Sequence, residues 1–190
     1  MLQGRGTESD RPGWEEMARQ ERIMTEERKG MRPAATQGRE GEYLTFVLAE
    51  EEYGVGILKV KEIIGMMPIT MVPRKPAYVK GVINLRGKVI PVMDLRLKFV
   101  LKAMEYTERT CIIVVEITRD SGNVLIGIVV DSVSEVLNIK ATDIDDTPNF
   151  SNQMNTDYIL GMAKVRGGVK ILLDIDRVLG SEGMESQDDD

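Results

Sequence analysis

The hydrophobic residues of this chain occur in short runs that are separated by turns containing glycine or proline. Alternating apolar and polar positions predict β-strands, and no long amphipathic helix is visible after residue 42. Short strands between turn signals are typical of small barrels or a sandwich, so we expect an all-β fold. The expected strand pairs are 43–48 with 53–57, 81–85 with 88–93, 111–118 with 124–130, and 162–166 with 169–173.

Short helical turns are expected between these strands. Residues 58–64 fit either a strand or one helical turn, and short helices are predicted at 95–101 and 176–179. Asp94 and Asp174 each follow an apolar strand and precede one of these helices. Aspartate in that place accepts hydrogen bonds from free backbone N–H groups, so both are predicted to be N-caps.

Part of the strand pattern occurs twice. The segment from Gly81 to Asp94 returns at an offset of 80 residues, with the glycine, the Arg-Gly pair and the aspartate all in place. Upstream of these segments, residues 54–64 match residues 127–137 at an offset of 73. A duplicated unit predicts a two-lobed body, in which features kept by both copies report turns and caps.

The two Arg-Gly hairpins differ in their flanking residues. In the first hairpin Asn84 and Leu85 precede Arg86-Gly87 and Lys88 follows, whereas the second hairpin has Lys164-Val165 before Arg166-Gly167 and Gly168 after. Glycine supplies the positive φ that a two-residue hairpin turn requires. Because these flanks differ, the two hairpins are expected to differ in role.

Glu62 and Arg86 are the candidate contact residues. Alternation across 58–64 places Leu58, Val60, Glu62 and Ile64 on one face, and a carboxylate on an apolar face requires a partner. We hypothesise that Glu62 pairs with Arg86. The alternatives remain open at this point: Glu62 faces solvent on a strand edge, and Arg86 is a solvated turn residue rather than a protein-contact residue.

Composition narrows the class of protein. Apolar residues make up 42% and charged residues 29%, as in soluble globular proteins, and no apolar run approaches the length of a membrane span. No secretory signal is visible, so the cytoplasm is expected. The formal net charge of −6 is concentrated in residues 181–190, which hold five acidic side chains and no Lys or Arg. The nearly neutral body and low aromatic content argue against a nucleic-acid-binding barrel.

Little in the chain suggests catalysis. There is no histidine, and the single cysteine, Cys111, lies in an apolar strand. This excludes histidine-based nucleophile systems, and no nucleotide-binding motif is present. A hydrolase using Asp94 and Asp174 is the enzymatic alternative, and the acidic residues 143–146 lack the pattern of a calcium loop. We expect no catalytic residue, no metal and no cofactor.

Composition also divides the chain into three parts. Residues 1–41 combine eight basic and eight acidic side chains with few large apolar groups, which predicts a flexible charged extension. Residues 42–180 carry the strands and form the expected folded body. Residues 181–190 are expected to be a disordered acidic tail.

Three segments of the body, 52–63, 81–96 and 127–137, closely resemble signature blocks of the CheW family of bacterial chemotaxis coupling proteins. The resemblance covers about residues 42–180. It implies two intertwined, five-stranded SH3-like barrels around a shared hydrophobic core. It also implies a stand-alone, non-catalytic cytoplasmic adaptor, recruited to membrane receptor arrays, that joins chemoreceptors to the histidine kinase CheA, whose regulatory domain is CheW-like. Direct membrane insertion is not expected.

The resemblance also implies site residues. Val60, Glu62, Arg86 and Ile112 would form the receptor-binding surface, and Gly81 falls at a functionally sensitive position of the family. The first Arg-Gly hairpin is accordingly expected to meet the receptor, and the second to keep mainly the architecture. For kinase binding the resemblance suggests Lys80 and Gly127. An adaptor of the same family in a non-flagellar pathway is an alternative that the residues do not separate from chemotaxis. Residues 1–41 exceed what a minimal coupling protein needs, and their role is left open.

Overall fold

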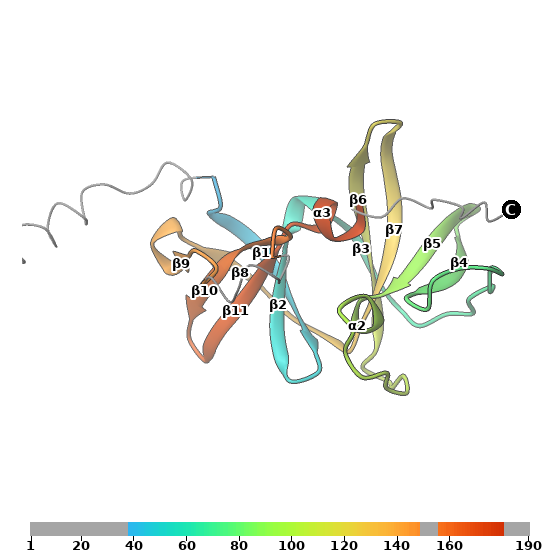
Figure 1. Cartoon of the computed structure of the whole chain (residues 1–190), viewed down its shortest axis with the longest axis horizontal. Coiled ribbons are helices and arrows are strands. Elements are labelled where there is room, and N and C mark those ends of the chain that lie inside the picture. The colour runs from blue at the N-terminus through green and yellow to red at the C-terminus, as the bar shows by residue number, and fades with distance from the viewer. Residues whose placement is uncertain (1–37, 149–155, 181–190) are drawn as a thin grey trace, which may run out of the picture. The chain divides into compact units, whose positions relative to one another are not determined.

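The computed structural model describes residues 38–148 and 156–180, which contain two β-sheets and a few short helices (Figure 1). The first sheet has the strand order β8-β1-β2-β11-β10-β9, and the second has the order β3-β6-β7-β5-β4. We call the part built on the first sheet lobe 1 and the part built on the second lobe 2. The acidic tail 181–190 and nearly all of the N-terminal extension lie outside the described residues.

Lobe 1 takes its strands from both ends of the body. They are β1 (Gly41–Leu48), β2 (Glu51–Gly56), β8 (Ser132–Ile139), β9 (Ile144–Asp145), β10 (Ile159–Val165) and β11 (Gly168–Leu173). Lobe 2 contains β3 (Val60–Gly65), β4 (Val79–Leu85), β5 (Lys88–Asp94), β6 (Cys111–Arg119) and β7 (Gly122–Val130). The helical turns are η1 (Ile57–Lys59), α2 (Leu95–Lys98), η2 (Ala141–Asp143) and α3 (Ile175–Gly180).

Most of the predicted elements are confirmed. All four expected strand pairs are antiparallel hairpins, and residues 58–64 contain both of the anticipated forms, the end of η1 followed by β3. Helix α2 is shorter than the predicted range 95–101. Strand β8 was not predicted, because its sequence, SVSEVLNI, is half polar and a bulge interrupts its pairing with β1.

The two sequence copies exchange strands. The chain crosses between the sheets only between β2 and β3 and between β7 and β8, within the part that the structure describes. Hairpin β4–β5 of the first copy therefore pairs with β7 of the second, and β11 of the second copy pairs with β2 of the first; both pairings are parallel. Each lobe is thus built from both copies, as intertwining requires.

Three hydrophobic clusters fill the body. The largest lies between the sheets and includes Phe46, Ile113, Ile128 and Ile175, so the prediction of a shared core is confirmed. The other two lie within the lobes. Strand β6 serves two clusters at once because successive side chains of a strand point to opposite faces. Ile113, Val115 and Ile117 face the shared core, whereas Ile112 and Val114 face the interior of lobe 2.

Each lobe closes in the same way. In lobe 2 the chain that follows β3 reaches the far edge strand, where Thr70 and Val82 exchange backbone hydrogen bonds of 2.8 and 2.9 Å. In lobe 1 the chain that follows β8 forms β9, which pairs with β10. Covering an edge strand leaves fewer backbone groups unpaired. Residues at opposite edges of the sheet are thereby brought close to one another.

Candidate partner-binding site

Glu62 and Arg86 form a bidentate ion pair that joins opposite edges of the lobe 2 sheet. Nη1 of Arg86 donates to Oε2 of Glu62 at 2.7 Å, and Nη2 donates to Oε1 at 2.5 Å. Glu62 lies on edge strand β3, and Arg86 lies in the turn after edge strand β4. The hypothesis that the two side chains pair is confirmed. The Arg86 side chain remains 73% exposed, so it is held in place and still available to a partner.

The hairpin turn explains how Arg86 reaches Glu62. Arg86 and Gly87 both have positive φ, 51° and 83°, which is the backbone of a type I′ turn. A positive φ is strained for arginine, and the Oδ1 atom of Asn84 supports the turn by accepting a hydrogen bond of 2.9 Å from the Gly87 N–H. Asn84 is therefore part of the site, and sequence reasoning noted it only as a flanking difference.

Charge pairing strengthens the ionised forms of both side chains. The hydrogen bonds from Arg86 lower the pKa of Glu62, and the Glu62 carboxylate raises the pKa of Arg86. A charged acceptor and a charged donor favour each other's ionised forms. Both groups are ionised at neutral pH even without this pairing, so its consequence is geometric: the bidentate contact fixes the plane of the guanidinium.

Val60 does not share a face with Glu62, which corrects the expectation from simple alternation. A β-bulge lies between them: Val60 pairs with Val115, whereas Glu62 pairs with Val114. The extra residue, Lys61, reverses the side-chain direction. Val60 consequently packs against the shared core, while Glu62 lies on the side of the lobe 2 interior.

Ile112 and Gly127 lie in the interior rather than on a surface, which corrects their expected position. Ile112 is fully buried, and Gly127 lies on β7 between β6 and β5. A Cβ atom added to Gly127 would lie 2.8 Å from Cγ2 of Ile112, so the glycine makes room for the isoleucine. A role of these two residues in binding, acting through packing, stays a prediction.

Gly81 is required by the closure of lobe 2. Its φ is 142°, and an added Cβ would lie 2.0 Å from the carbonyl oxygen of Thr70, which bonds to Val82. Any side chain here would push the closing segment away from β4. Gly81 therefore supports the hairpin that carries Arg86. Lys80, the neighbouring candidate for kinase binding, is half-buried, with its Nζ 5.9 Å from the centre of the Tyr106 ring.

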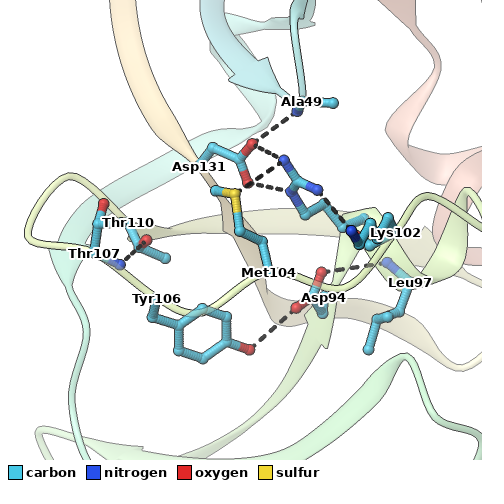
Figure 2. Close-up of polar contacts among 10 residues, drawn as sticks. Ala49, Asp94, Leu97, Lys102, Met104, Tyr106, Thr107, Thr110 and Asp131 are labelled. Atoms are coloured by element: carbon cyan, nitrogen blue, oxygen red, sulfur yellow. Dashed lines mark hydrogen bonds and ion pairs between the residues drawn. The ribbon is translucent and has the colours of Figure 1, made fainter.

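The two aspartates of the enzymatic alternative are helix caps. Oδ1 of Asp94 accepts from the Leu97 N–H at 3.3 Å, and its Oδ2 accepts from the Tyr106 hydroxyl at 3.1 Å (Figure 2). Oδ1 of Asp174 accepts from the Arg177 N–H at 3.2 Å. Burial and the adjacent Asp94 raise the pKa of Tyr106, which keeps this hydroxyl a donor. Both carboxylates are engaged as the N-cap prediction required.

The described residues contain no cluster of three or more Cys, Asp or Glu side chains that could hold a metal ion. Across the same part of the chain, no helix combines the length and the apolar character needed to cross a membrane.

Comparison with known proteins agrees with this geometry. The family model of the CheW-like domain matches residues 42–183. Chemotaxis protein CheW of Klebsiella aerogenes is 42% identical over 143 residues, which span 75% of this chain and 84% of that protein. Chemotaxis protein CheW of Rhizobium meliloti is 36% identical over 145 residues, which span 76% of this chain and 91% of that protein.

A solved structure matches the fold as well. Scaffolding protein TtCheW from Thermoanaerobacter tengcongensis superposes with a TM-score of 0.67 at 32% sequence identity, covering 78% of this chain and 98% of that one. Sequence and fold thus agree over the whole body and include the hairpin that holds Arg86. The chain belongs to the CheW family of chemotaxis scaffold proteins.

Proposed function

We propose that this protein couples transmembrane chemoreceptors to a CheA-type histidine kinase as a non-catalytic adaptor, recruited from the cytoplasm to receptor arrays. Family membership supports the adaptor role. The single observation that carries the assignment of the receptor surface is the Glu62–Arg86 ion pair. Arginine held in a fixed orientation beside apolar surface is a favourable protein-contact residue, because guanidinium both stacks and forms directional hydrogen bonds.

The receptor surface centres on Arg86 and Glu62. Two of the guanidinium nitrogens face Glu62, and the side chain is otherwise exposed to a partner. The ion pair costs a partner little to engage, because the two charges already neutralise each other and Arg86 has already lost rotamer freedom. Such a surface suits the helical tip of a receptor, with apolar contacts surrounded by a charged rim. Gly81 and Ile112 would contribute indirectly, because they fix the positions of β4 and β6 beneath this surface.

The kinase surface is proposed at Lys80, beside the partly exposed ring of Tyr106. An amphipathic aromatic side chain next to a cation is a common feature of protein interfaces. The receptor and kinase surfaces would lie on the same lobe, at opposite ends of strand β4. A shift of the receptor could then change the placement of the kinase without covalent chemistry in the adaptor.

Reconstitution tests the proposal. The full chain is mixed with a receptor signalling fragment and a histidine kinase that carries a CheW-like domain, and receptor-stimulated autophosphorylation is measured. We expect the wild type to couple the two, and Arg86→Ala and Glu62→Ala to lose receptor binding while kinase binding is retained. Arg166→Ala is the matched control, because it removes the equivalent arginine of the second hairpin. Normal coupling by Arg86→Ala would overturn the assigned surface.

A further inference from the structure

Both crossings between the lobes are held by an ion pair. The chain passes from lobe 1 to lobe 2 through η1, which ends at Lys59, and returns at Asp131, the single residue between β7 and β8. Each of these two residues forms an ion pair with the second residue of a short helix, Asp176 in α3 and Arg96 in α2. We call these the Lys59–Asp176 clamp and the Arg96–Asp131 clamp.

The Arg96–Asp131 clamp is nearly buried. Nε and Nη2 of Arg96 donate to the two oxygens of Asp131 at 2.7 and 2.8 Å, and Nη1 donates to the Lys102 carbonyl at 2.6 Å. Oδ2 of Asp131 also accepts from the Ala49 N–H of lobe 1 at 2.7 Å (Figure 2). The side chains are only 11% and 16% exposed. Helix α2, which follows a strand of lobe 2, is thereby connected to the β1–β2 turn of lobe 1.

The Lys59–Asp176 clamp is more exposed. Nζ of Lys59 lies 2.6 Å from Oδ2 of Asp176, and Oδ1 of Asp176 accepts from the Thr118 N–H at 2.7 Å. Here the side chains are 37% and 30% exposed. Helix α3, which follows a strand of lobe 1, is thereby connected to the corner of lobe 2 where β3 begins beside β6.

The two clamps lie at corresponding places in the duplicated fold and are opposite in charge, but their crossing residues differ by one position. The offset of 73 aligns Asp131 with Leu58, the residue before Lys59. Arg96 and Asp176 are related by the offset of 80 residues. The residues whose backbone N–H groups donate to the two clamp carboxylates, Ala49 and Thr118, also correspond. Thr45 pairs with Gly54 as Val114 pairs with Gly127, and Ala49 and Thr118 each lie four residues further on. In one clamp the helix supplies the cation and the crossing supplies the carboxylate. In the other clamp these roles are reversed, so the same connection has been built twice from different side chains.

We propose that Lys59 and Asp176 are positioning residues that set the orientation of β3, and with it Glu62, relative to lobe 1. The receptor-binding consequence rests on the function proposed above. Lys59 is followed directly by β3 and lies three residues before Glu62. The nearly buried Arg96–Asp131 clamp holds one crossing firmly, whereas the partly exposed Lys59–Asp176 clamp leaves the other adjustable, because solvent weakens an exposed pair.

The test removes the Lys59–Asp176 ion pair but keeps the hydrogen bond from the Thr118 N–H to residue 176. Asp176→Asn keeps an oxygen that can accept from the Thr118 N–H, and Lys59→Met keeps the length of the side chain without its charge. The two single variants and their combination form a double-mutant cycle. The matched control is Lys61→Met, because Lys61 forms an ion pair of similar exposure with Glu116, at 3.1 Å, entirely within lobe 2. All variants carry Cys111→Ala so that only introduced cysteines react.

Two measurements, the distance between the lobes and the affinity for the receptor fragment, test this proposal and the proposed receptor function separately. Spin labels at Val89→Cys in lobe 2 and Val169→Cys in lobe 1 report the distance between lobes in the free protein; both valines are exposed. We expect each single variant to broaden the distance distribution, the combination to broaden it no further, and Lys61→Met to leave it unchanged. The clamp variants should bind the receptor fragment about two- to fivefold more weakly, which corresponds to the usual contribution of a partly exposed ion pair. The Lys61→Met control should bind it normally.

Each outcome decides a separate point. An unchanged distance distribution in the clamp variants overturns the proposal, whether or not the affinity for the receptor fragment changes. A changed distribution with unchanged receptor affinity overturns the positioning of Glu62. If the wild type itself fails to bind the receptor fragment, the proposed function fails, and the distance measurement still decides whether the clamp orients the lobes.

Discussion

The two Arg-Gly hairpins have the same origin in the sequence but different local structures. In the first hairpin Arg86 has a positive φ, Asn84 bonds to the Gly87 N–H, and the arginine pairs with Glu62. In the second hairpin positive φ is found at Gly167 and Gly168 instead. Arg166 and Glu135, the counterparts of Arg86 and Glu62, form no ion pair with each other in the described structure, and Glu135 is exposed.

Flanking residues account for the difference. Lys164 replaces Asn84 and so cannot support the turn in the same way; it forms an ion pair with Asp145 at 2.8 Å instead. Gly168 replaces Lys88 and adds a second glycine at the turn, beside Gly167. Both copies contain the Arg-Gly pair, but only the first forms the ion pair between its arginine and the glutamate of the preceding strand, within the described residues. The turn type decides where the arginine points.

The lobe interiors differ in a parallel way. Ile83 and Ile90 pair across β4–β5 in lobe 2, whereas their counterparts in lobe 1 are Ala163 and Lys170. Lys170 is buried and forms an ion pair with Glu52 of β2, which also accepts a hydrogen bond from Ser134. Lobe 2 is thus packed entirely with aliphatic side chains at these positions, and lobe 1 contains a charge that requires its partner.

The largest expected effect concerns the closing glycines. Gly81→Ala should lower the free energy of unfolding by about 3 kcal/mol, because the added Cβ meets backbone and the residue has a positive φ. Gly161→Ala should lower it by only about 1–2 kcal/mol, since its nearest contacts are 2.7 and 2.8 Å away and its φ is not positive. Urea denaturation followed by circular dichroism measures both, and equal losses would contradict the comparison.

The next effect concerns the charged interior of lobe 1. Glu52→Gln should lower the free energy of unfolding by about 2 kcal/mol, because it leaves the buried Lys170 ammonium without a charged partner. Adding Lys170→Ile, which copies lobe 2, should recover most of the loss. Stability measured for the single and double variants decides the point. Failure of Lys170→Ile to rescue Glu52→Gln would mean that the ion pair is not the reason for the difference between lobes.

A smaller effect is expected from exchanging the flanks of the hairpins. Asn84→Lys combined with Lys88→Gly gives the first hairpin the flanks of the second and should release Arg86 from Glu62. Affinity for a receptor fragment, measured by titration, should fall about five- to tenfold, as for loss of a contact residue at a protein interface. The same exchange in the second hairpin, Lys164→Asn with Gly168→Lys, is the control. Equal effects of the two exchanges would show that the hairpins do not differ in function.

The smallest effect is expected from pH. The pKa of Glu62 is lowered from 4.5 by Arg86, so the carboxylate stays ionised as the pH falls toward that ordinary value. The contribution of the pair is complete above the ordinary pKa and is lost only as the pH falls through the lowered pKa. Receptor affinity should therefore be constant between about pH 8 and pH 5. A decline in affinity centred above pH 5 would indicate that another group, rather than Glu62, controls the contact.

Much of this protein was determined by the sequence alone. Most strand positions, the Arg86-Gly87 turn and the caps at Asp94 and Asp174 follow from local patterns, because alternation, glycine and short polar side chains act within a few residues. Strand β8 is the exception, because its sequence is half polar. The sequence also suggested the ion pair between Glu62 and Arg86, but the apolar face used in that argument included Val60, which the bulge places elsewhere. The duplication predicted two lobes.

The tertiary structure decided the rest. Which copy supplies which strand depends on pairing between distant segments, and no local pattern specifies it. The bulge at Lys61 moved Val60 to the other face, and burial on both faces of β6 removed Ile112 from the surface. The Arg96–Asp131 and Lys59–Asp176 clamps join residues 35 or more positions apart, so they exist only once the exchange of strands has brought those positions together.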